Sequence, residues 1–292
     1  MRQQKLEGLV MKNNHGFYVI SVSIMYFLIF TSLCLKNAEA KQSFNFVFLA
    51  DSSLNSFADP VNASILSPIV SSILAISPAP SVVIFGGDSA FFGSTAYFNI
   101  FKSYFTNPIE GAGIPTVSLV GNHDISSLQP LQAQQEFQGL FNSRWNQNGP
   151  SGYNNLAFSF EIGNSLFVIT DDYYITSAND PIPDGYVSQS QLSWISSTLS
   201  ASTAAHKFVI GHTNAYNPFQ PTLNPAFAAL WSAIAGNAAV YFCGHQHLYY
   251  RTNHDGTYEV ISGGAGSERG SSDPSGTPGP IFPTDVFSWD YG

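Results

Sequence analysis

The stretch that decides the fold is YFCGHQHLYYR, residues 241–251, in which an apolar run ends in a glycine and two histidines. Its first three residues are apolar, as in a buried strand. The run changes character at Gly244, and His245 and His247 follow one residue apart. In an extended segment, residues two apart point to the same side, so both imidazoles can face one site. The stretch therefore predicts a polar site at the end of a buried strand.

Similar β-rich runs recur along the chain, and each ends in small or polar residues. They lie at 44–50, 82–85, 116–120, 166–170, 207–210 and 239–243. Several are almost continuously apolar, which is typical of strands covered on both faces. A further run at 156–162 is expected to form a hairpin with 166–170 around Gly163 and Asn164.

Helical patterns alternate with these runs. Ser188 and Gln191 have the spacing of a capping box ahead of a helix. Further helices are predicted at 61–76, 95–105, 131–141 and 225–235. The alternation of strand and helix patterns predicts a layered α/β fold. The stretch 263–283 is rich in Gly, Pro and Ser, which predicts a long irregular loop.

The first forty residues differ from the rest of the chain. Basic residues precede an apolar stretch at 17–35, and Ala38-Glu39-Ala40 follows it. This order predicts a signal peptide at 1–40, hence a secreted or periplasmic domain at 41–292 without stable membrane contact. The alternative is an uncleaved membrane anchor, because the apolar stretch approaches the ~20 residues that span a bilayer.

Composition limits the function classes. The formal net charge of the chain is −9, which argues against a nucleic-acid backbone as the main partner. Cys243 is the only cysteine after residue 40, so the predicted domain has no internal disulfide. Residues 41–292 are an ordinary length for one α/β domain with a large core.

Residue types that bind metals follow the carboxyl ends of five predicted strands. They are Asp51, Asp88, Asn122 within Gly121-Asn122-His123-Asp124, His212, and the pair His245 and His247. In α/β sheets, ligands bind at that edge. Imidazole and carboxylate together suit Zn, Fe or Mn, and the absence of thiolates at these ends argues against a soft-metal site. Each residue alone has an ordinary explanation as a turn or a helix cap. Their recurrence at five strand ends predicts a metal site.

These motifs resemble those of the calcineurin-like metallophosphoesterase family, and most closely its purple acid phosphatase branch. The family motifs Asp-x-His, Gly-Asp, Gly-Asn-His-Asp, Gly-His and Gly-His-x-His match in order between Asp51 and His247. The stretches GHQHLYYR, QSQLSWISSTL and VISGGAGS also resemble that branch. The resemblance implies a four-layer α-β-β-α sandwich with the metal site at the carboxyl ends of the strands.

The resemblance also implies a role for each residue. Asp51 and His247 would hold a first metal ion, Asn122, His212 and His245 would hold a second, and Asp88 would bridge both. The two ions would be divalent or trivalent Fe, Zn or Mn. His123 would lie beside the substrate as the general acid, oriented by Asp124.

The sequence departs from the family pattern at three places. Ser53 stands where Asp-x-His has a histidine, and Phe91 stands where purple acid phosphatases have a ligating tyrosine. The first metal ion is therefore short of one protein ligand. The chain also stops at VFSWDYG, where relatives continue into another strand. Either the sheet ends early or the sequence is a fragment.

The leading interpretation is an exported, metal-dependent hydrolase of small phosphate esters. Two ions would hold the phosphate, a bridging hydroxide would attack phosphorus, and His123 would donate a proton to the leaving group. Arg251 is a candidate phosphate contact, with a surface ion pair as the alternative. Two other functions remain open. One is a non-catalytic or single-metal binding protein, and the other is a secreted nuclease or nucleotidase, which the acidic composition disfavours.

Overall fold

The computed structural model describes residues 43–178, 180, 185–219, 222–268 and 286–288 of the 292-residue chain. The predicted signal peptide at 1–40 lies outside the described residues, as does most of the predicted loop at 263–283. Within the described ranges, none of the helices combines the length and the apolar character needed to cross a bilayer.

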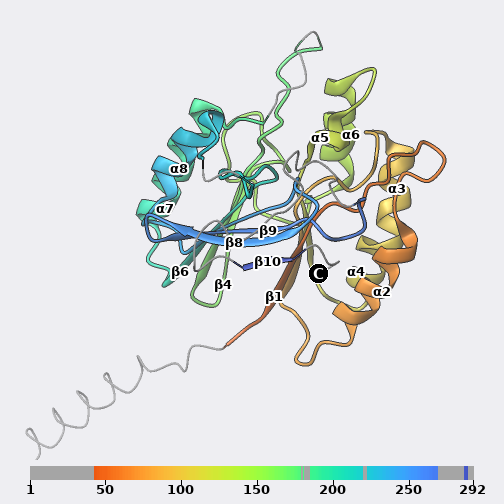
Figure 1. Cartoon of the computed structure of the whole chain (residues 1–292), viewed down its shortest axis with the longest axis horizontal. Coiled ribbons are helices and arrows are strands. Elements are labelled where there is room, and N and C mark those ends of the chain that lie inside the picture. The colour runs from red at the N-terminus through yellow and green to blue at the C-terminus, as the bar shows by residue number, and fades with distance from the viewer. Residues whose placement is uncertain (1–42, 179, 181–184, 220–221, 269–285, 289–292) are drawn as a thin grey trace, which may run out of the picture. The chain divides into compact units, whose positions relative to one another are not determined.

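Two β-sheets form the centre of this domain (Figure 1). The smaller sheet is parallel and contains β1 (Phe46–Leu49), β2 (Val82–Phe85) and β3 (Thr116–Ser118), in that order. The larger sheet is mixed and has the order β10-β8-β9-β7-β6-β5-β4. Its strands are β4 (Phe158–Ile162), β5 (Ser165–Ile169), β6 (His206–Ile210), β7 (Val240–Cys243), β8 (Tyr249–His254), β9 (Thr257–Ser262) and β10 (Val286–Ser288).

The two sheets pack face to face on an aromatic core. The ring of Phe46 on β1 lies 5.1 Å from that of Phe167 on β5 and 5.7 Å from that of Phe242 on β7. Side chains alternate along a strand, so β2 turns Ile84 to this core and Phe85 to the helices on its other side. Both faces of the strand are buried, which explains why these runs are almost continuously apolar.

Helices cover the outer faces of both sheets. Those that pack on the smaller sheet are α2 (Ala63–Leu74), α3 (Thr95–Tyr104), α4 (Thr106–Gly111) and α6 (Pro130–Leu140). Those that pack on the larger sheet are α7 (Gln189–Ala201) and α8 (Ala228–Ile234), the latter entered through the short helix η1 (Pro225–Phe227). The predicted four-layer α-β-β-α sandwich is therefore confirmed.

The predicted capping box of α7 is only half formed. The Ser188 hydroxyl accepts from the backbone N–H of Gln191, as predicted. The Gln191 side chain does not return to the helix start. It accepts from the backbone N–H of Asp171 at 3.0 Å and donates to the carbonyl of the same residue. The glutamine thus ties α7 to the end of β5.

The β8–β9 hairpin was not predicted, although its turn signal is present in the sequence. Asp255 and Gly256 connect the strands with φ values of 53° and 82°, the left-handed geometry that an Asp-Gly pair favours in hairpins. β10 then pairs with β8 in antiparallel register at the sheet edge. The larger sheet therefore includes residues 286–288 as a strand beside β8.

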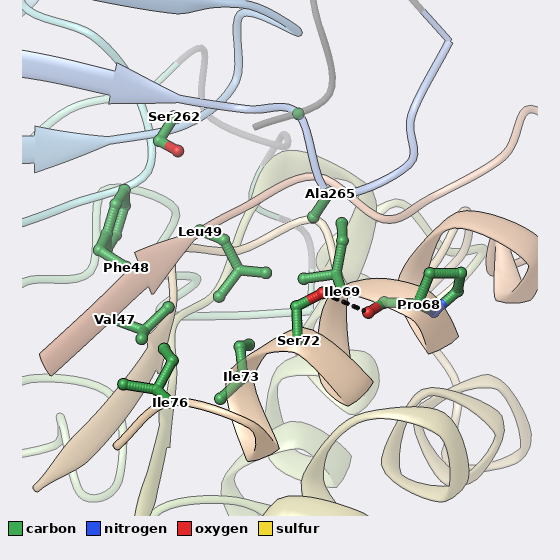
Figure 2. Close-up of a pocket in the computed structure, with 11 residues that line it drawn as sticks. Val47, Phe48, Leu49, Pro68, Ile69, Ser72, Ile73, Ile76, Ser262 and Ala265 are labelled. Carbon is green, nitrogen blue, oxygen red and sulfur yellow. Dashed lines mark hydrogen bonds between the residues drawn. The ribbon is translucent and has the colours of Figure 1, made fainter. Parts of the chain in front are cut away.

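An apolar cavity of about 390 Å³ lies between β1 and α2 (Figure 2). Val47 and Leu49 line it from the strand, and Ile69 and Ile73 line it from the helix. None of its lining residues is ionisable, so the cavity offers no group for phosphate or metal chemistry. The ligand-type residues lie instead at the strand ends.

Candidate metal centre

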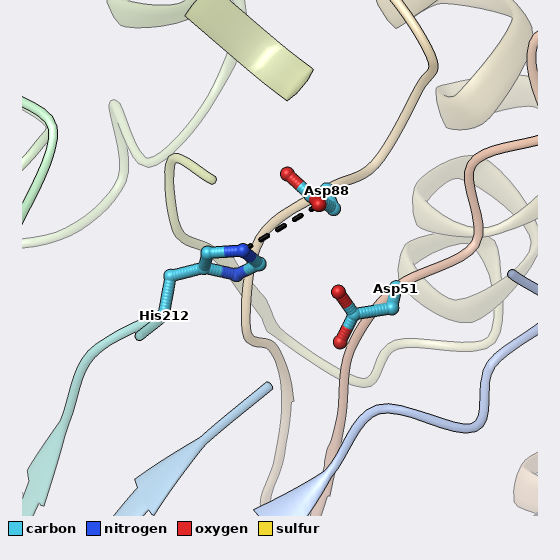
Figure 3. Close-up of side chains that lie close together, drawn as sticks. All are labelled: Asp51, Asp88 and His212. Atoms are coloured by element: carbon cyan, nitrogen blue, oxygen red, sulfur yellow. Dashed lines mark ion pairs between the residues drawn. The ribbon is translucent and has the colours of Figure 1, made fainter. Parts of the chain in front are cut away.

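Three buried side chains converge at the carboxyl ends of strands from both sheets (Figure 3). Asp51 follows β1, Asp88 lies just beyond β2, and His212 lies just beyond β6. One potential ligand atom of each lies within 4.8 Å of the others. Parallel strands end at a common edge, which is how residues far apart in the sequence meet there.

Asn122 places a further oxygen ligand between two imidazoles. It is the first residue of the short helix α5 (Asn122–Ile125), which follows β3. Its Oδ1 lies 3.2 Å from Nε2 of His212 and 3.0 Å from Nδ1 of His245. On the far side of its ring, His212 pairs Nδ1 with the carbonyl of Gly86 at 2.8 Å. That bond makes Nδ1 the donor and turns Nε2 toward the centre.

His247 joins the centre on the Asp51 side. Its Nε2 lies 3.8 Å from Oδ1 of Asp51, and its Nδ1 pairs with the carbonyl of Glu268. The Asp51 carboxylate also accepts from the backbone N–H of His245, at 3.0 Å to Oδ2. Backbone groups of neighbouring loops therefore orient the side chains of both Asp51 and His247.

The ligand-type residues form two groups that meet at Asp88. One is the pair Asp51 and His247. The other is the set of Asn122, His212 and His245. Asp88 accepts from the backbone N–H of His123 through Oδ1 at 2.9 Å and faces His212 through Oδ2 at 3.5 Å. Ligand atoms of Asp51, Asp88 and His212 lie within 4.8 Å of one another, so Asp88 lies close to a member of each group.

The electrostatics of the centre fit a bound cation. Burial, with the nearby charge of Asp88, raises the pKa of Asp51 well above its usual value. Burial alone would lower the pKa of His212, but the charge and hydrogen bond of Asp88, together with the charges of Asp51 and Asp172, outweigh burial and raise that pKa to about 10. A proton on His212 thus offsets negative charge that a metal ion would neutralise. Burial and the charge of His212 lower the pKa of His245 to about 4, so at neutral pH this ring is in the uncharged form that binds metals.

Backbone strain is concentrated at these residues. Asp51, Asp88 and His245 adopt φ values of 69°, 55° and 68°, in the left-handed region that side chains other than glycine rarely occupy. Such conformations cost free energy and persist where the surrounding structure imposes them, often at functional sites. The strain turns each side chain away from its strand and into the centre.

Two glycines let the backbone approach the carboxylates closely. A Cβ at Gly121 would lie 2.2 Å from Oδ1 of Asp88, and one at Gly244 would lie 2.4 Å from Oδ2 of Asp51. Neither position can carry a side chain without displacing a ligand-type residue. Both glycines therefore permit the close approach of backbone to carboxylate on which the centre depends.

His123 is held differently from the sequence-based expectation. Its Nδ1 pairs with the carbonyl of Phe91 at 3.0 Å, not with Asp124. The Asp124 carboxylate is fully buried and accepts from the backbone N–H groups of Asp88 and Gly121, each at 2.9 Å. It also accepts from the N–H and hydroxyl of Ser89. In the structure, therefore, the Phe91 carbonyl orients the His123 ring, and backbone N–H groups of the neighbouring loops bind the Asp124 carboxylate. Asp124 fixes the loop that carries Asp88.

Asp172 supports the centre and was not among the predicted site residues. It is fully buried after β5 and accepts from the backbone N–H of His212, at 3.1 Å, and from that of Thr213. This carboxylate fixes the loop that carries His212. Asp172 closely follows the predicted strand 166–170, and the predicted ligand residues also follow predicted strands. This place in the sequence could therefore have indicated Asp172 as a site residue.

The residues that depart from the family pattern do not complete the first group. Ser53 is buried, and its hydroxyl lies 3.2 Å from that of Ser267. The Phe91 side chain has no atom that can bind a metal, and its ring lies 5.5 Å from that of His123. Arg251 is exposed on β8 with its guanidinium 6.0 Å from the centre of the Tyr258 ring, which is a surface contact.

The comparisons with known proteins agree with this geometry. Residues 45–249 match the model of the calcineurin-like phosphoesterase family. No curated protein matches the chain in sequence.

Solved structures show the same fold at low sequence identity. A dimetal phosphatase from Danio rerio has a TM-score of 0.56 at 15% identity, over 75% of this chain and 86% of that one. GAP50, the anchor in the inner membrane complex of Plasmodium, has a TM-score of 0.57 at 15% identity, over 85% of this chain and 78% of that one. PhoD has a TM-score of 0.50 at 15% identity, over 75% of this chain and 56% of that one. With the family match over most of its length, the chain belongs to the calcineurin-like phosphoesterase family.

Proposed function

We propose that this protein hydrolyses phosphoric esters at a two-metal centre, with His123 as the general acid. The observation that carries the proposal is the convergence of Asp51, Asp88 and His212 within 4.8 Å at the shared edge of the two sheets. The family supports a phosphoesterase, and the ligand-type residues supply the oxygen and nitrogen donors that Fe, Zn or Mn prefer.

In the proposed reaction, Asp88 and the other ligand-type residues would bind metal ions, and His123 would transfer a proton. Bound metal ions supply Lewis-acid stabilisation of the phosphoryl oxygens and lower the pKa of water. Asp88 lies within 4.8 Å of a ligand atom of Asp51 and of His212, and its carboxylate would help to hold the metal ions. The carbonyl of Phe91 holds Nδ1 of His123 as a donor, which leaves Nε2 to face the substrate. A protonated His123 would donate the Nε2 proton to the leaving oxygen as its bond to phosphorus breaks.

Hydrolysis of p-nitrophenyl phosphate tests this function. The purified protein would be loaded with Mn, Zn or Fe and compared with the Asp88→Asn variant. Asp180→Asn is the matched control, because it makes the same change in a carboxylate whose partners are Thr176 and Ser177. We expect turnover by the wild type and the control, and its loss in Asp88→Asn. Absence of turnover by the wild type with every metal would overturn the proposal.

A binding protein of the same fold is the second candidate. Ser53 and Phe91 leave the Asp51–His247 group short of one ligand, which favours weak or single-metal occupancy. GAP50, which is described as an anchor, has the same fold. At 15% identity, this similarity is evidence for a shared fold and not for a shared function. One ion or none per chain, together with no turnover, would favour this candidate over the enzyme.

We also propose that the protein acts outside the cytoplasm. Basic residues, the apolar stretch at 17–35 and Ala38-Glu39-Ala40 support export through cleavage after Ala40. N-terminal sequencing of protein recovered from the native host tests this. A mature chain that begins near Lys41 is expected, whereas an intact N-terminus on membrane-bound protein would show an anchor.

A further inference from the structure

We infer that this centre acts on phosphate esters whose leaving group is uncharged and aromatic or otherwise apolar. The inference rests on the proposed phosphoesterase function and assigns its substrate class. It is carried by Phe57, Phe91 and Phe92, which we call the aromatic rim, and by the placement of the basic side chains.

The rings of the aromatic rim form a continuous series of contacts between the solvent-exposed Phe57 and His123. Phe57 is 62% exposed, and its ring lies 5.1 Å from that of Phe91 and 5.5 Å from that of Phe92, both edge-on. The ring of Phe91 lies in turn 5.5 Å from that of His123. A largely exposed phenylalanine joined to further aromatic rings is the kind of apolar surface that marks a binding site.

Hydrogen bonds to backbone groups of Phe57 and Phe91 hold the aromatic rim in place. The Tyr97 hydroxyl donates to the carbonyl of Phe57 at 2.9 Å. The backbone N–H of Phe91 donates to the carbonyl of Pro60 at 2.9 Å, and the Phe91 carbonyl holds Nδ1 of His123. The rim and His123 are therefore joined through one residue. Because His123 faces the leaving oxygen in the proposed reaction, the rim lies where the rest of the leaving group would be.

The basic side chains of the described residues are placed away from this rim. Lys102 and Lys207 donate to the carbonyls of Leu140 and Leu199, Arg144 lies 3.9 Å from Glu110, and Arg251 lies over Tyr258. None of these contacts involves a metal ligand or a rim residue. A second phosphate on the leaving group would be paired there by none of the four Lys and Arg side chains that the structure describes, which disfavours polyphosphates and nucleotides.

Binding of two non-hydrolysable phosphonates tests the inference without relying on turnover. 2-Naphthylphosphonate carries the aromatic group, and methylphosphonate lacks it. Titration of the full-length protein, with Mn²⁺ present, would give a dissociation constant for each. We expect the naphthyl compound to bind about tenfold more tightly, because part of its ring surface is removed from water against the rim.

Substitution of Phe57 identifies the surface that makes the difference. Phe57→Ala is expected to weaken 2-naphthylphosphonate binding about threefold or more, from the lost apolar contact, and to leave methylphosphonate unchanged. Tyr104→Ala is the matched control, since Tyr104 is also a partly exposed aromatic residue, at 41%, but lies at the end of α3. It should change neither constant. Thermal unfolding of both variants checks that the fold is retained.

The outcomes separate the substrate class from the function itself. Equal affinities for the two phosphonates in a wild type that hydrolyses p-nitrophenyl phosphate would overturn the substrate class and leave the proposed function intact. An equal loss in Phe57→Ala and Tyr104→Ala would overturn the role of the rim. A wild type that binds neither phosphonate and hydrolyses no ester with any metal would overturn both proposals.

Discussion

The carboxylate of Asp88 and Nε2 of His212 lie 3.5 Å apart, although the strands that precede them belong to different sheets. Asp88 follows β2 of the smaller sheet, and His212 follows β6 of the larger one. The contact therefore forms only when the two sheets are packed against each other. Metal binding at this point would be coupled to folding, because an unfolded chain does not hold these groups together.

Metal removal is expected to destabilise the fold. A ligand that binds only the folded state adds about 2.7 kcal/mol to the free energy of unfolding at 100 times its dissociation constant. Chelation should therefore lower the melting temperature by several degrees, which a thermal scan with and without chelator measures. Asp88→Asn should show a much smaller shift. An identical shift in that variant would place the stabilising metal elsewhere.

His123→Ala is expected to slow hydrolysis without removing the metals. Loss of a general acid costs on the order of 100- to 10,000-fold in turnover. The loss should be smaller for p-nitrophenyl phosphate than for an alkyl phosphate, because a nitrophenolate leaves more readily without a proton. Turnover of both esters and elemental analysis of the variant check this. Equal losses for the two esters would argue against proton donation by His123.

Asp172→Asn is expected to weaken metal binding through His212. The Asp172 carboxylate accepts two backbone N–H bonds in the loop that carries this histidine. Supporting groups of this kind contribute about 10- to 100-fold to metal affinity. Competition with a chromophoric chelator measures the change.

The neighbouring residue provides the matched control. Asp171 is also buried after β5, but the hydrogen bond that its carboxylate accepts comes from the backbone N–H of Tyr173, not from the loop that carries His212. Burial raises the pKa of Asp171 to about 7, so an uncharged amide is a mild replacement there. Asp171→Asn should leave metal affinity unchanged. A similar loss of affinity in both variants would mean a general loosening of the loop.

Stability should fall as the pH rises through the titration of Glu259. This residue is fully buried on β9, and burial raises its pKa from 4.5 to about 8, although it accepts from the backbone N–H groups of Ala215 and Tyr216. A folded-state pKa above the unfolded value contributes stability that is present below about pH 4.5 and lost as the pH approaches about 8. The Glu259→Gln variant, which has no charge to bury, should lose less stability over this interval.

Urea unfolding at about pH 5 and about pH 8 measures the difference between the wild type and Glu259→Gln. Glu161→Gln removes an exposed carboxylate from β4 and should behave like the wild type. A Glu259→Gln variant whose stability falls as steeply as that of the wild type would contradict the prediction.

The layers and the ligand positions could be predicted because each depends on a short local pattern. Apolar runs such as 82–85 require burial on both faces, and polar residues immediately after them lie at the shared sheet edge. The β8–β9 hairpin could also have been predicted, since Asp255 and Gly256 form a recognised turn pair.

The remaining features depend on packing that the sequence does not reveal. The bond from His123 to the carbonyl of Phe91 requires the loops after β2 and β3 to lie side by side. The support of His212 by Asp172 likewise requires the ends of β5 and β6 to be adjacent. The family resemblance implies that Asp124 orients His123, and the sequence gives no sign that the backbone N–H groups of Asp88 and Gly121 bind this carboxylate.

The metal content of the purified protein tests the central claim most directly. Elemental analysis of the wild type, after saturation with Mn or Zn and removal of free ions, should give about two ions per chain. Asp88→Asn should give about one or fewer, because both ligand groups lose the carboxylate between them, and Asp180→Asn should match the wild type. A wild type without bound metal, or an Asp88→Asn variant that retains the full content, would contradict a metal centre built on Asp88.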